Sequence, residues 1–185
     1  IQQVIGIVNG TTNYMLTKMS KEGLDFQTVL ADAQALGYAE ADPTSDIEGY
    51  DAARKVAILA SIAFNTRVTL DQVYVEGITQ ITTEDIRYAG DLNYVIKLLG
   101  IAKEDETGIE VRVHPAMLPK QHPLAAVNDV YNAVFVSGDA VGNVMFFGPG
   151  AGELPTASAV VGDIISAARS LLKNVPGLYN CTCYS

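Results

Sequence analysis

The stretch that decides the fold is YVIKLLGIAKEDETGIEVRVHPAML, residues 94–118. Its two halves are rich in aliphatic and β-branched residues, and the polar segment around Asp105–Gly108 separates them. That pattern is typical of a β-hairpin. YNAVFVSG (131–138) and NVMFFG (143–148) repeat it around Asp139–Gly142. Two hairpins in succession predict an antiparallel sheet in the second half of the chain.

The residues before these hairpins predict another strand that leads into a helix. QVIGIVN, residues 3–9, is apolar enough for a buried strand. GTTNYMLTKMSKEG follows, with Thr12 or Asn13 as the expected N-cap and Gly23 as the residue that ends the helix.

Two further helices are expected between residues 25 and 64. Asp25 can cap the first, whose apolar side chains recur at helical spacing until Gly37. Ser45 with Glu48 three residues later has the pattern of a capping box at the start of the second. That helix continues through YDAARKVAILASIAF, which is apolar on most sides and therefore predicts a central position.

The remaining segments complete an α+β fold. VYVEGIT (73–79) predicts a strand, TTEDIRYAGDL (82–92) a short helix opened by Thr83, and HPLAAV (122–127) a helical turn. LPTASAVVGDIISAARSLLKN (154–174) predicts a closing amphipathic helix. We expect a mixed, largely antiparallel sheet with helices packed on one face.

The other face of the sheet is expected to mediate dimerisation. The strands at 131–136 and 143–147 are apolar at nearly every position, and such strands need cover on both faces. Because one helical layer covers only one face, we expect a second subunit to cover the other. The sequence therefore predicts a homodimer.

The composition argues against several classes of partner. The net charge is −9 with no basic patch, so nucleic acid is not an expected ligand. No uninterrupted apolar run of about 18 residues is present, so no membrane span is expected. The chain begins with IQQVIGIVNG, without an initiator Met or the pattern of a signal peptide. We expect a piece of a longer cytoplasmic polypeptide.

The expected domain covers residues 1–174, and residues 175–185 are expected to form a tail or linker. This tail holds Cys181 and Cys183, the two cysteines of the chain. A Cys-x-Cys pair could bind a metal, but the two histidines, His114 and His122, lie far away in sequence. We therefore expect no metal site.

The stretch GYAEADPTSDIEGYDAARK (37–55) concentrates negative charge before the central helix, and we consider three interpretations, of which the first and the third stay open. Carboxylates are favoured at a helix N-terminus, which needs no function. A calcium loop needs Gly at its sixth position and Glu at its twelfth, and no register supplies both. A site for an amino acid would use both charge signs, and Asp51 and Lys55 share a helix face. The carboxylates of the 37–55 stretch are Glu40, Asp42, Asp46, Glu48 and Asp51.

A glycine cluster, FFGPGAGELPTASAV (146–160), lies between the last strand and the closing helix. Gly148, Gly150 and Gly152 do not form a dinucleotide fingerprint, since Glu153 stands where the third glycine is needed and no strand follows. The cluster is either a tight turn or a backbone that approaches a ligand closely. The segment NGTTNY (9–14) also allows two interpretations: it is either a helix cap or a rim of backbone amides that binds a ligand.

Three motifs together resemble homoserine dehydrogenase. GIVNGTTNYMLTKM, AQALGYAEADPTSDIEGYDAARKVAILA and GPGAGELPTASAVVGD have that family's order and spacing. The resemblance covers about residues 3–174 and implies NAD(P)-dependent interconversion of L-homoserine and L-aspartate 4-semialdehyde, a step toward threonine, isoleucine and methionine. It corresponds to the catalytic and dimerisation part, without the family's N-terminal Rossmann domain.

The resemblance also implies roles for individual residues. Asp51 and Lys55 match the pair at the reacting hydroxyl, and Glu40 matches the carboxylate that binds the substrate ammonium. Gly10, Thr11, Tyr38 and Asp46 match positions that line the substrate. Gly148, Gly150 and Gly152 match a loop beside the nicotinamide of NAD or NADP, which the missing Rossmann domain mainly binds.

Lys55 is expected to handle the proton of the substrate hydroxyl, with Asp51 orienting Lys55 or that hydroxyl. A second lysine of the family lies in the missing domain, so we expect the 185-residue chain alone to be inactive. The alternative is a non-catalytic, acidic dimerisation module. A dinucleotide fingerprint upstream of Ile1 would favour the enzyme.

Overall fold

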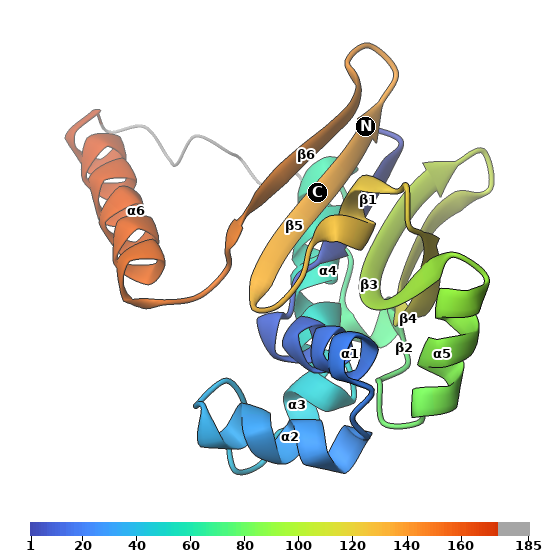
Figure 1. The fold of residues 1–185 in the computed structure, drawn as a ribbon. Coiled ribbons are helices and arrows are strands. Elements are labelled where there is room, and N and C mark those ends of the chain that lie inside the picture. The colour runs from blue at the N-terminus through green and yellow to red at the C-terminus, as the bar shows by residue number, and fades with distance from the viewer. Residues whose placement is uncertain (174–185) are drawn as a thin grey trace.

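A computed structural model describes residues 1–173 of the chain. The elements, shown in Figure 1, are β1 (Gln3–Ile7), α1 (Gly10–Glu22), α2 (Phe26–Ala35), α3 (Thr44–Ile47), α4 (Tyr50–Ala63), the 3₁₀ turn η1 (Leu70–Gln72), β2 (Tyr74–Val75), α5 (Thr83–Asp91), β3 (Tyr94–Asp105), β4 (Gly108–Pro119), the 3₁₀ turn η2 (Pro123–Ala126), β5 (Tyr131–Gly138), β6 (Gly142–Pro149) and α6 (Glu153–Lys173). No helix among these residues is long and apolar enough to cross a membrane.

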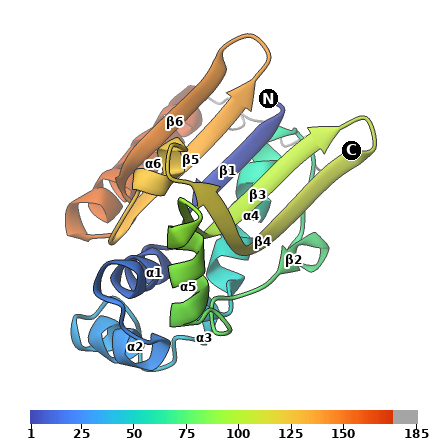
Figure 2. The same cartoon turned by 45° about the vertical axis from the view of Figure 1, so that its right-hand side comes forward.

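The strands of residues 1–173 form one sheet in the order β2-β4-β3-β1-β5-β6 (Figure 2). Both predicted hairpins are confirmed: β3 pairs with β4, and β5 pairs with β6. The N-terminal strand β1 lies between the hairpins and is antiparallel to both neighbours. The short β2 is parallel to β4. The predicted α+β class with a mixed, largely antiparallel sheet is therefore confirmed.

Helices α1 and α4 pack on one face of the sheet and form the larger core. The buried side of α4 is mostly alanine, which lets the helix backbone approach the strands closely. A Cβ added to Gly100 of β3 would lie 3.0 Å from Val56 Cβ of α4, so helix and strand are in direct contact. Val4, Val111 and Val113 contribute to this core from the strands.

The opposite face carries a smaller core under η2. Leu124 and Ala125 of this turn are buried against Ile7 and Leu99. The chain therefore covers part of this face itself. Beyond η2, toward β6, large apolar side chains stay exposed, among them Met145 and Phe147.

The N-cap of α1 lies three or four residues before the predicted one. Asn9 is the N-cap, and its side chain accepts a hydrogen bond from the Thr12 backbone N–H. The predicted caps Thr12 and Asn13 are buried inside the helix. The apolar pattern of residues 3–9 predicts a strand that includes Asn9, whereas β1 ends at Ile7, two residues before Asn9.

The predicted capping box at Ser45 and Glu48 is wrong. Two helices, α3 and α4, meet here, and neither has a side-chain cap. Gly49 separates them with a left-handed backbone, φ 85°, which favours glycine. The Ser45 hydroxyl instead accepts a hydrogen bond from Arg54 of α4 at 2.9 Å.

The strand predicted at 73–79 is short because the chain leaves the sheet after Val75 to pack on α3. The Ile78 backbone N–H donates to the Ile47 carbonyl at 2.8 Å. Gly77 passes so close to α3 that an added Cβ would lie 2.5 Å from Glu48 Cα. The helix expected at 82–92 is confirmed as α5, with Thr82 as its N-cap.

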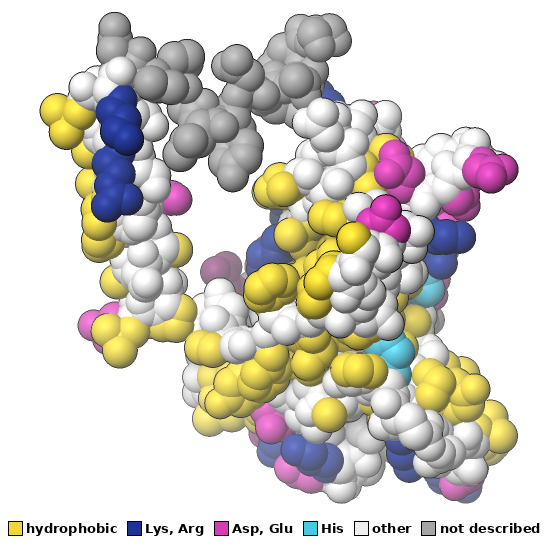
Figure 3. Space-filling model, turned by 90° about the horizontal axis from the view of Figure 1, so that it is seen from above, with side chains coloured by type: hydrophobic (Ala, Val, Ile, Leu, Met, Phe, Trp, Pro, Cys, Tyr) yellow, Lys and Arg dark blue, Asp and Glu magenta, His cyan; other side chains and the backbone are white. Residues whose placement is uncertain are grey.

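The closing helix forms as predicted, but it does not pack on the sheet. Figure 1 shows α6 standing apart from the body beyond the turn that follows β6. None of its residues is buried within the described chain. Figure 3 shows hydrophobic side chains along this isolated helix. The predicted tail, with Cys181 and Cys183, lies outside the described residues.

Candidate functional site

The site begins where β1 turns into α1. Asn9 is 5% exposed, and its Oδ1 accepts from the Thr12 N–H and the Thr12 hydroxyl, both at 2.9 Å. The first N–H groups of an α-helix have no intrahelical partner. Gly10 and Thr11 occupy these positions and line a pocket. This helix end can therefore bind an anionic group such as a carboxylate.

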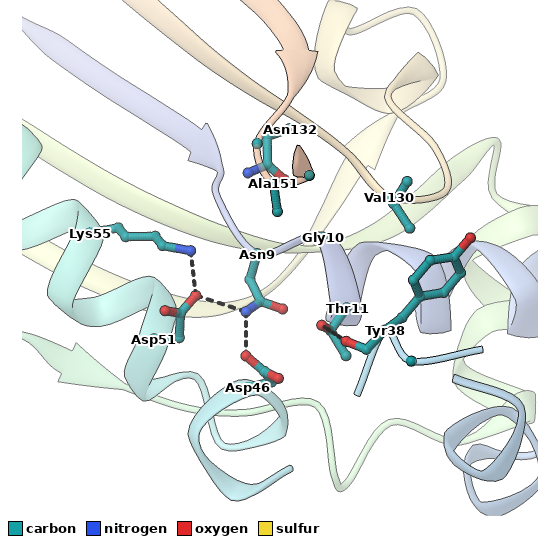
Figure 4. A pocket seen from close by; sticks show the side chains of 13 residues that line it. Asn9, Gly10, Thr11, Tyr38, Asp46, Asp51, Lys55, Val130, Asn132 and Ala151 are labelled. Carbon is teal, nitrogen blue, oxygen red and sulfur yellow. Dashed lines mark hydrogen bonds and ion pairs between the residues drawn. The ribbon is translucent and has the colours of Figure 1, made fainter. Parts of the chain in front are cut away.

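Two carboxylates from α3 and α4 meet at the same amide. Asn9 Nδ2 donates to Asp46 Oδ1 at 2.7 Å and to Asp51 Oδ2 at 2.8 Å (Figure 4). The turn at Gly49 permits this, because it redirects the chain between the helix that carries Asp46 and the helix that carries Asp51.

Lys55 completes the polar wall of the pocket. Its Nζ lies 2.7 Å from Asp51 Oδ2, one helical turn earlier on α4, and donates to the Val8 carbonyl at 3.0 Å. About half of the Lys55 side chain is exposed. The ammonium is thus fixed on one side and accessible to a ligand on the other.

The pocket has a volume of about 450 Å³, which suits a small molecule. Tyr38 lies at its edge, where its carbonyl accepts a hydrogen bond from the Thr11 hydroxyl at 2.6 Å. The ring of Tyr38 packs edge-on against Tyr14. The opposite wall contains Val130, Asn132 and the segment 150–152.

Asn132 has a polar atom without a partner. Its Oδ1 is buried and makes no hydrogen bond in the described part of the chain. Gly150 lies directly against this carboxamide, since an added Cβ would be 1.8 Å from Asn132 Nδ2. A buried acceptor at a pocket wall is costly unless a ligand or water satisfies it.

The structure brings most of the predicted site residues together. Those that line the pocket are Gly10, Thr11, Tyr38, Asp46, Asp51, Lys55, Gly150 and Gly152. Glu40 is exposed and outside this set, and its backbone carbonyl accepts a hydrogen bond from Gln34. Gly148 is paired with Asn132 between β6 and β5, also outside the set. The roles of all these residues remain predictions.

Sequence reasoning named neither Asn9 nor Asn132 as a site residue, although Asn9 is the first residue of the NGTTNY motif. An Asn before a helix is a favoured N-cap, so the position of Asn9 contained a usable signal. Asn132 lies within an apolar strand, and no local pattern distinguishes it. Its place in the pocket follows from the pairing of β5 with β1, which brings residues far apart in sequence together.

Comparison with known proteins identifies the family. A family model described as homoserine dehydrogenase matches residues 1–165. The chain belongs to the homoserine dehydrogenase family. The homoserine dehydrogenase of Bacillus subtilis is 54% identical over 177 residues, which cover 96% of this chain and 41% of that protein. The homoserine dehydrogenase of Corynebacterium glutamicum is 57% identical over 175 residues, which cover 92% of this chain and 39% of that protein. The chain therefore spans about two fifths of the length of these relatives.

Solved structures of homoserine dehydrogenases share the fold. The enzyme from Thiobacillus denitrificans has a TM-score of 0.91 at 52% identity, with 94% of this chain and 40% of that chain covered. A hyperthermophilic archaeal homoserine dehydrogenase, solved in complex with NADPH, has a TM-score of 0.77 at 29% identity. The match covers 97% of this chain and 50% of that chain.

Proposed function

We propose that this chain forms the substrate-binding and catalytic part of an NAD(P)-dependent homoserine dehydrogenase, which interconverts L-homoserine and L-aspartate 4-semialdehyde. The observation that carries the proposal is the Lys55–Asp51 pair on the wall of a pocket that also contains a helix N-terminus. Family membership supports the same reaction. A non-catalytic dimerisation module would have no use for a lysine held at a pocket by two acceptors.

The pocket offers complementary groups for both charges of an amino acid. The N–H groups at Gly10 and Thr11 suit the α-carboxylate. The carboxylates of Asp46 and Asp51 make the facing wall negative, which suits the ammonium. Glu40 lies two residues beyond Tyr38 but outside the residues that line the pocket, so its proposed contact with the ammonium rests on the family resemblance.

Lys55 supplies the proton in the direction of reduction. Its ammonium donates to the aldehyde oxygen as negative charge develops there, which lowers the energy of the transition state. In the direction of oxidation this step runs in reverse, and the Lys55 amine, without its extra proton, accepts the hydroxyl proton. Asp51 holds the Lys55 amine in position through their 2.7 Å contact.

The residues at the opposite wall fit NAD or NADP. The unpartnered Oδ1 of Asn132 can accept a hydrogen bond from a ligand N–H, and Gly150 lets the 148–152 segment lie against Asn132. When bound, the nicotinamide exchanges a hydride with the substrate carbon that carries the oxygen. This chain's own part is to place the substrate between Lys55 and that segment.

The test compares the 185-residue chain with the full-length protein that contains it. With L-homoserine and NAD or NADP, the full-length protein is expected to form the reduced cofactor, whereas the 185-residue chain alone is expected to form none. D-homoserine serves as a control for the amino-acid site. The absence of turnover by the full-length protein with either cofactor would contradict the proposed function.

A further inference from the structure

Asn9 connects the two carboxylates of the pocket through one buried amide. Both hydrogens of its Nδ2 are used, one for Asp46 and one for Asp51. Its Oδ1 accepts from a backbone N–H and from the Thr12 hydroxyl. Because a carboxylate only accepts and a backbone N–H only donates, this network permits a single orientation of the amide. The hydrogen-bonding capacity of Asn9 is therefore fully satisfied.

The same amide reduces the cost of placing two negative charges together. Asp46 Oδ1 and Asp51 Oδ2 both lie within 2.8 Å of one nitrogen, so the carboxylates are close to each other. Lys55 contacts Asp51 but has no bond to Asp46 within residues 1–173. The charged side chains that line the pocket in the described chain are Asp46, Asp51 and Lys55. Without a donor between them, the two acids would repel each other.

We propose that Asn9 is a positioning residue for catalysis, which holds Asp46 and Asp51 aligned so that Asp51 presents Oδ2 to Lys55. This inference rests on the proposed function. Since Asn9 also caps α1, one side chain sets the register of three parts of the site: the N-terminus of α1, Asp46 on α3 and the Asp51–Lys55 pair on α4. Misplacement of reacting groups by about 1 Å can cost on the order of 100-fold in rate.

The decisive variant is Asn9→Asp in the full-length enzyme. Aspartate keeps the size and the capping oxygen of Asn9, but it replaces the double donor by a third carboxylate. At pH 8 we expect kcat to fall by about 100-fold. At acidic pH a protonated carboxyl can donate in place of the amide. The kcat of the variant, relative to that of the parent at the same pH, is therefore expected to rise as the pH falls toward 5.

Two further variants separate positioning from folding. Asn9→Ser keeps an N-cap oxygen but cannot reach both carboxylates, so its kcat is expected to be low at every pH. Gln27→Glu on α2 makes the same change from amide to carboxylate at an exposed position outside the pocket, and is expected to keep the parent profile. If Asn9→Asp keeps the parent kcat and pH profile per folded molecule, the inference is wrong and the proposed function stands.

Thermal melting gives a readout that does not depend on activity. In Asn9→Asp the clustered carboxylates hold a proton more strongly in the folded protein than in the unfolded chain, so stability is lost as the pH rises. The melting temperature of the variant is expected to lie below that of the parent at pH 8 and to approach it at pH 5. A constant difference over this range would contradict the proposed network, even if the parent had no dehydrogenase activity.

Discussion

At the scale of single residues, Lys55 is the group on which the proposed chemistry depends. Lys55→Ala in the full-length enzyme is expected to lower kcat by about 10²–10⁴-fold, the effect of losing a general acid–base group. Stability should change little, because half of the side chain is exposed. Steady-state kinetics with melting curves measure both. Lys103→Ala, which removes an exposed lysine on β3, is the matched control and should keep full activity.

Glu40 is expected to behave differently from Lys55. A contact with the substrate ammonium exists in the ground state and in the transition state, so Glu40→Ala should raise KM for homoserine with kcat little changed. Glu48→Ala is the control, because Glu48 lies on the same acidic stretch outside the pocket. Equal KM values for the two variants would show that Glu40 does not bind the substrate.

The site could be predicted from the sequence where its geometry is local. Asp51 and Lys55 are four residues apart on one helix, and helical spacing alone places them together. The contacts of Asn9 with Asp46 and Asp51 span 37 and 42 residues, and they depend on how α3 packs on α1 and α4 packs on β1. Helical spacing carries no information about such contacts.

At the scale of elements, the turn between β6 and α6 depends on a close contact with β5. The backbone of Gly150 has an ordinary φ, so alanine is allowed there, but its Cβ would lie 1.8 Å from Asn132 Nδ2. Gly150→Ala should therefore destabilise the protein, and Asn132→Ala in the same chain should remove the clash. We expect a coupling of about 0.5–3 kcal/mol in a double-mutant cycle measured by urea unfolding. Additive effects would contradict this contact.

A buried lysine joins three elements behind the site. Lys97 of β3 is 3% exposed, and its Nζ donates to Asn13 Oδ1 of α1, to the Val127 carbonyl and to Asn128 Oδ1. Three acceptors match the three hydrogens of an ammonium. Asn13 Nδ2 in turn donates to the carbonyls of the 127–131 segment. This network fixes the segment that carries Val130 and leads to Asn132.

The Lys97 network predicts a dependence of stability on pH. Burial lowers the pKa of Lys97 from 10.5 to about 8, and nearby Asp129 and Lys21 have smaller, opposing effects. Between about pH 8 and pH 10.5 the unfolded chain binds more protons than the folded protein, so the free energy of unfolding rises with pH. The shift corresponds to roughly 3 kcal/mol.

Urea unfolding of the full-length enzyme and of its Lys97→Met variant, at pH 7 to 10, measures this effect. Methionine cannot titrate, so the stability of the parent relative to Lys97→Met should increase as the pH rises from about 8 to 10. Below pH 8 the difference should be constant, because the lysine is then charged in both states. If the free energies of unfolding of the parent and of Lys97→Met changed in parallel over the whole pH range, the lowered pKa of Lys97 would be contradicted.

The sequence predicted the elements better than their ends. The hairpins and α2 follow from turn residues and periodicity close by in the chain, whereas β2 is shortened by the contact of Gly77 with α3. The same reasoning predicted α6 as a helix but could not place it. Its apolar residues find no surface to pack against within residues 1–173.

At the scale of the whole molecule, the sheet has an uncovered apolar surface. On the face opposite α1 and α4, the register aligns Phe135 with Met145 and Ala133 with Phe147, and Tyr131 stacks on Phe147. Met145 and Phe147 are 40% and 57% exposed, and β6 is the edge strand of the sheet. We propose that a second copy of the chain covers this surface, which would otherwise leave an apolar patch of the kind that marks interfaces.

Sedimentation at micromolar concentration tests this dimer. The 185-residue chain, of 19.7 kDa, is expected to sediment at twice its mass. Phe147→Glu would place a charge in the centre of the buried contact, where it has no partner, and should shift the chain to monomer. Tyr74→Glu makes the same kind of change at an exposed position on β2, the opposite edge strand, and should leave the dimer intact. A parent chain that sediments as a monomer, or equal dissociation in both variants, would exclude this surface as the interface.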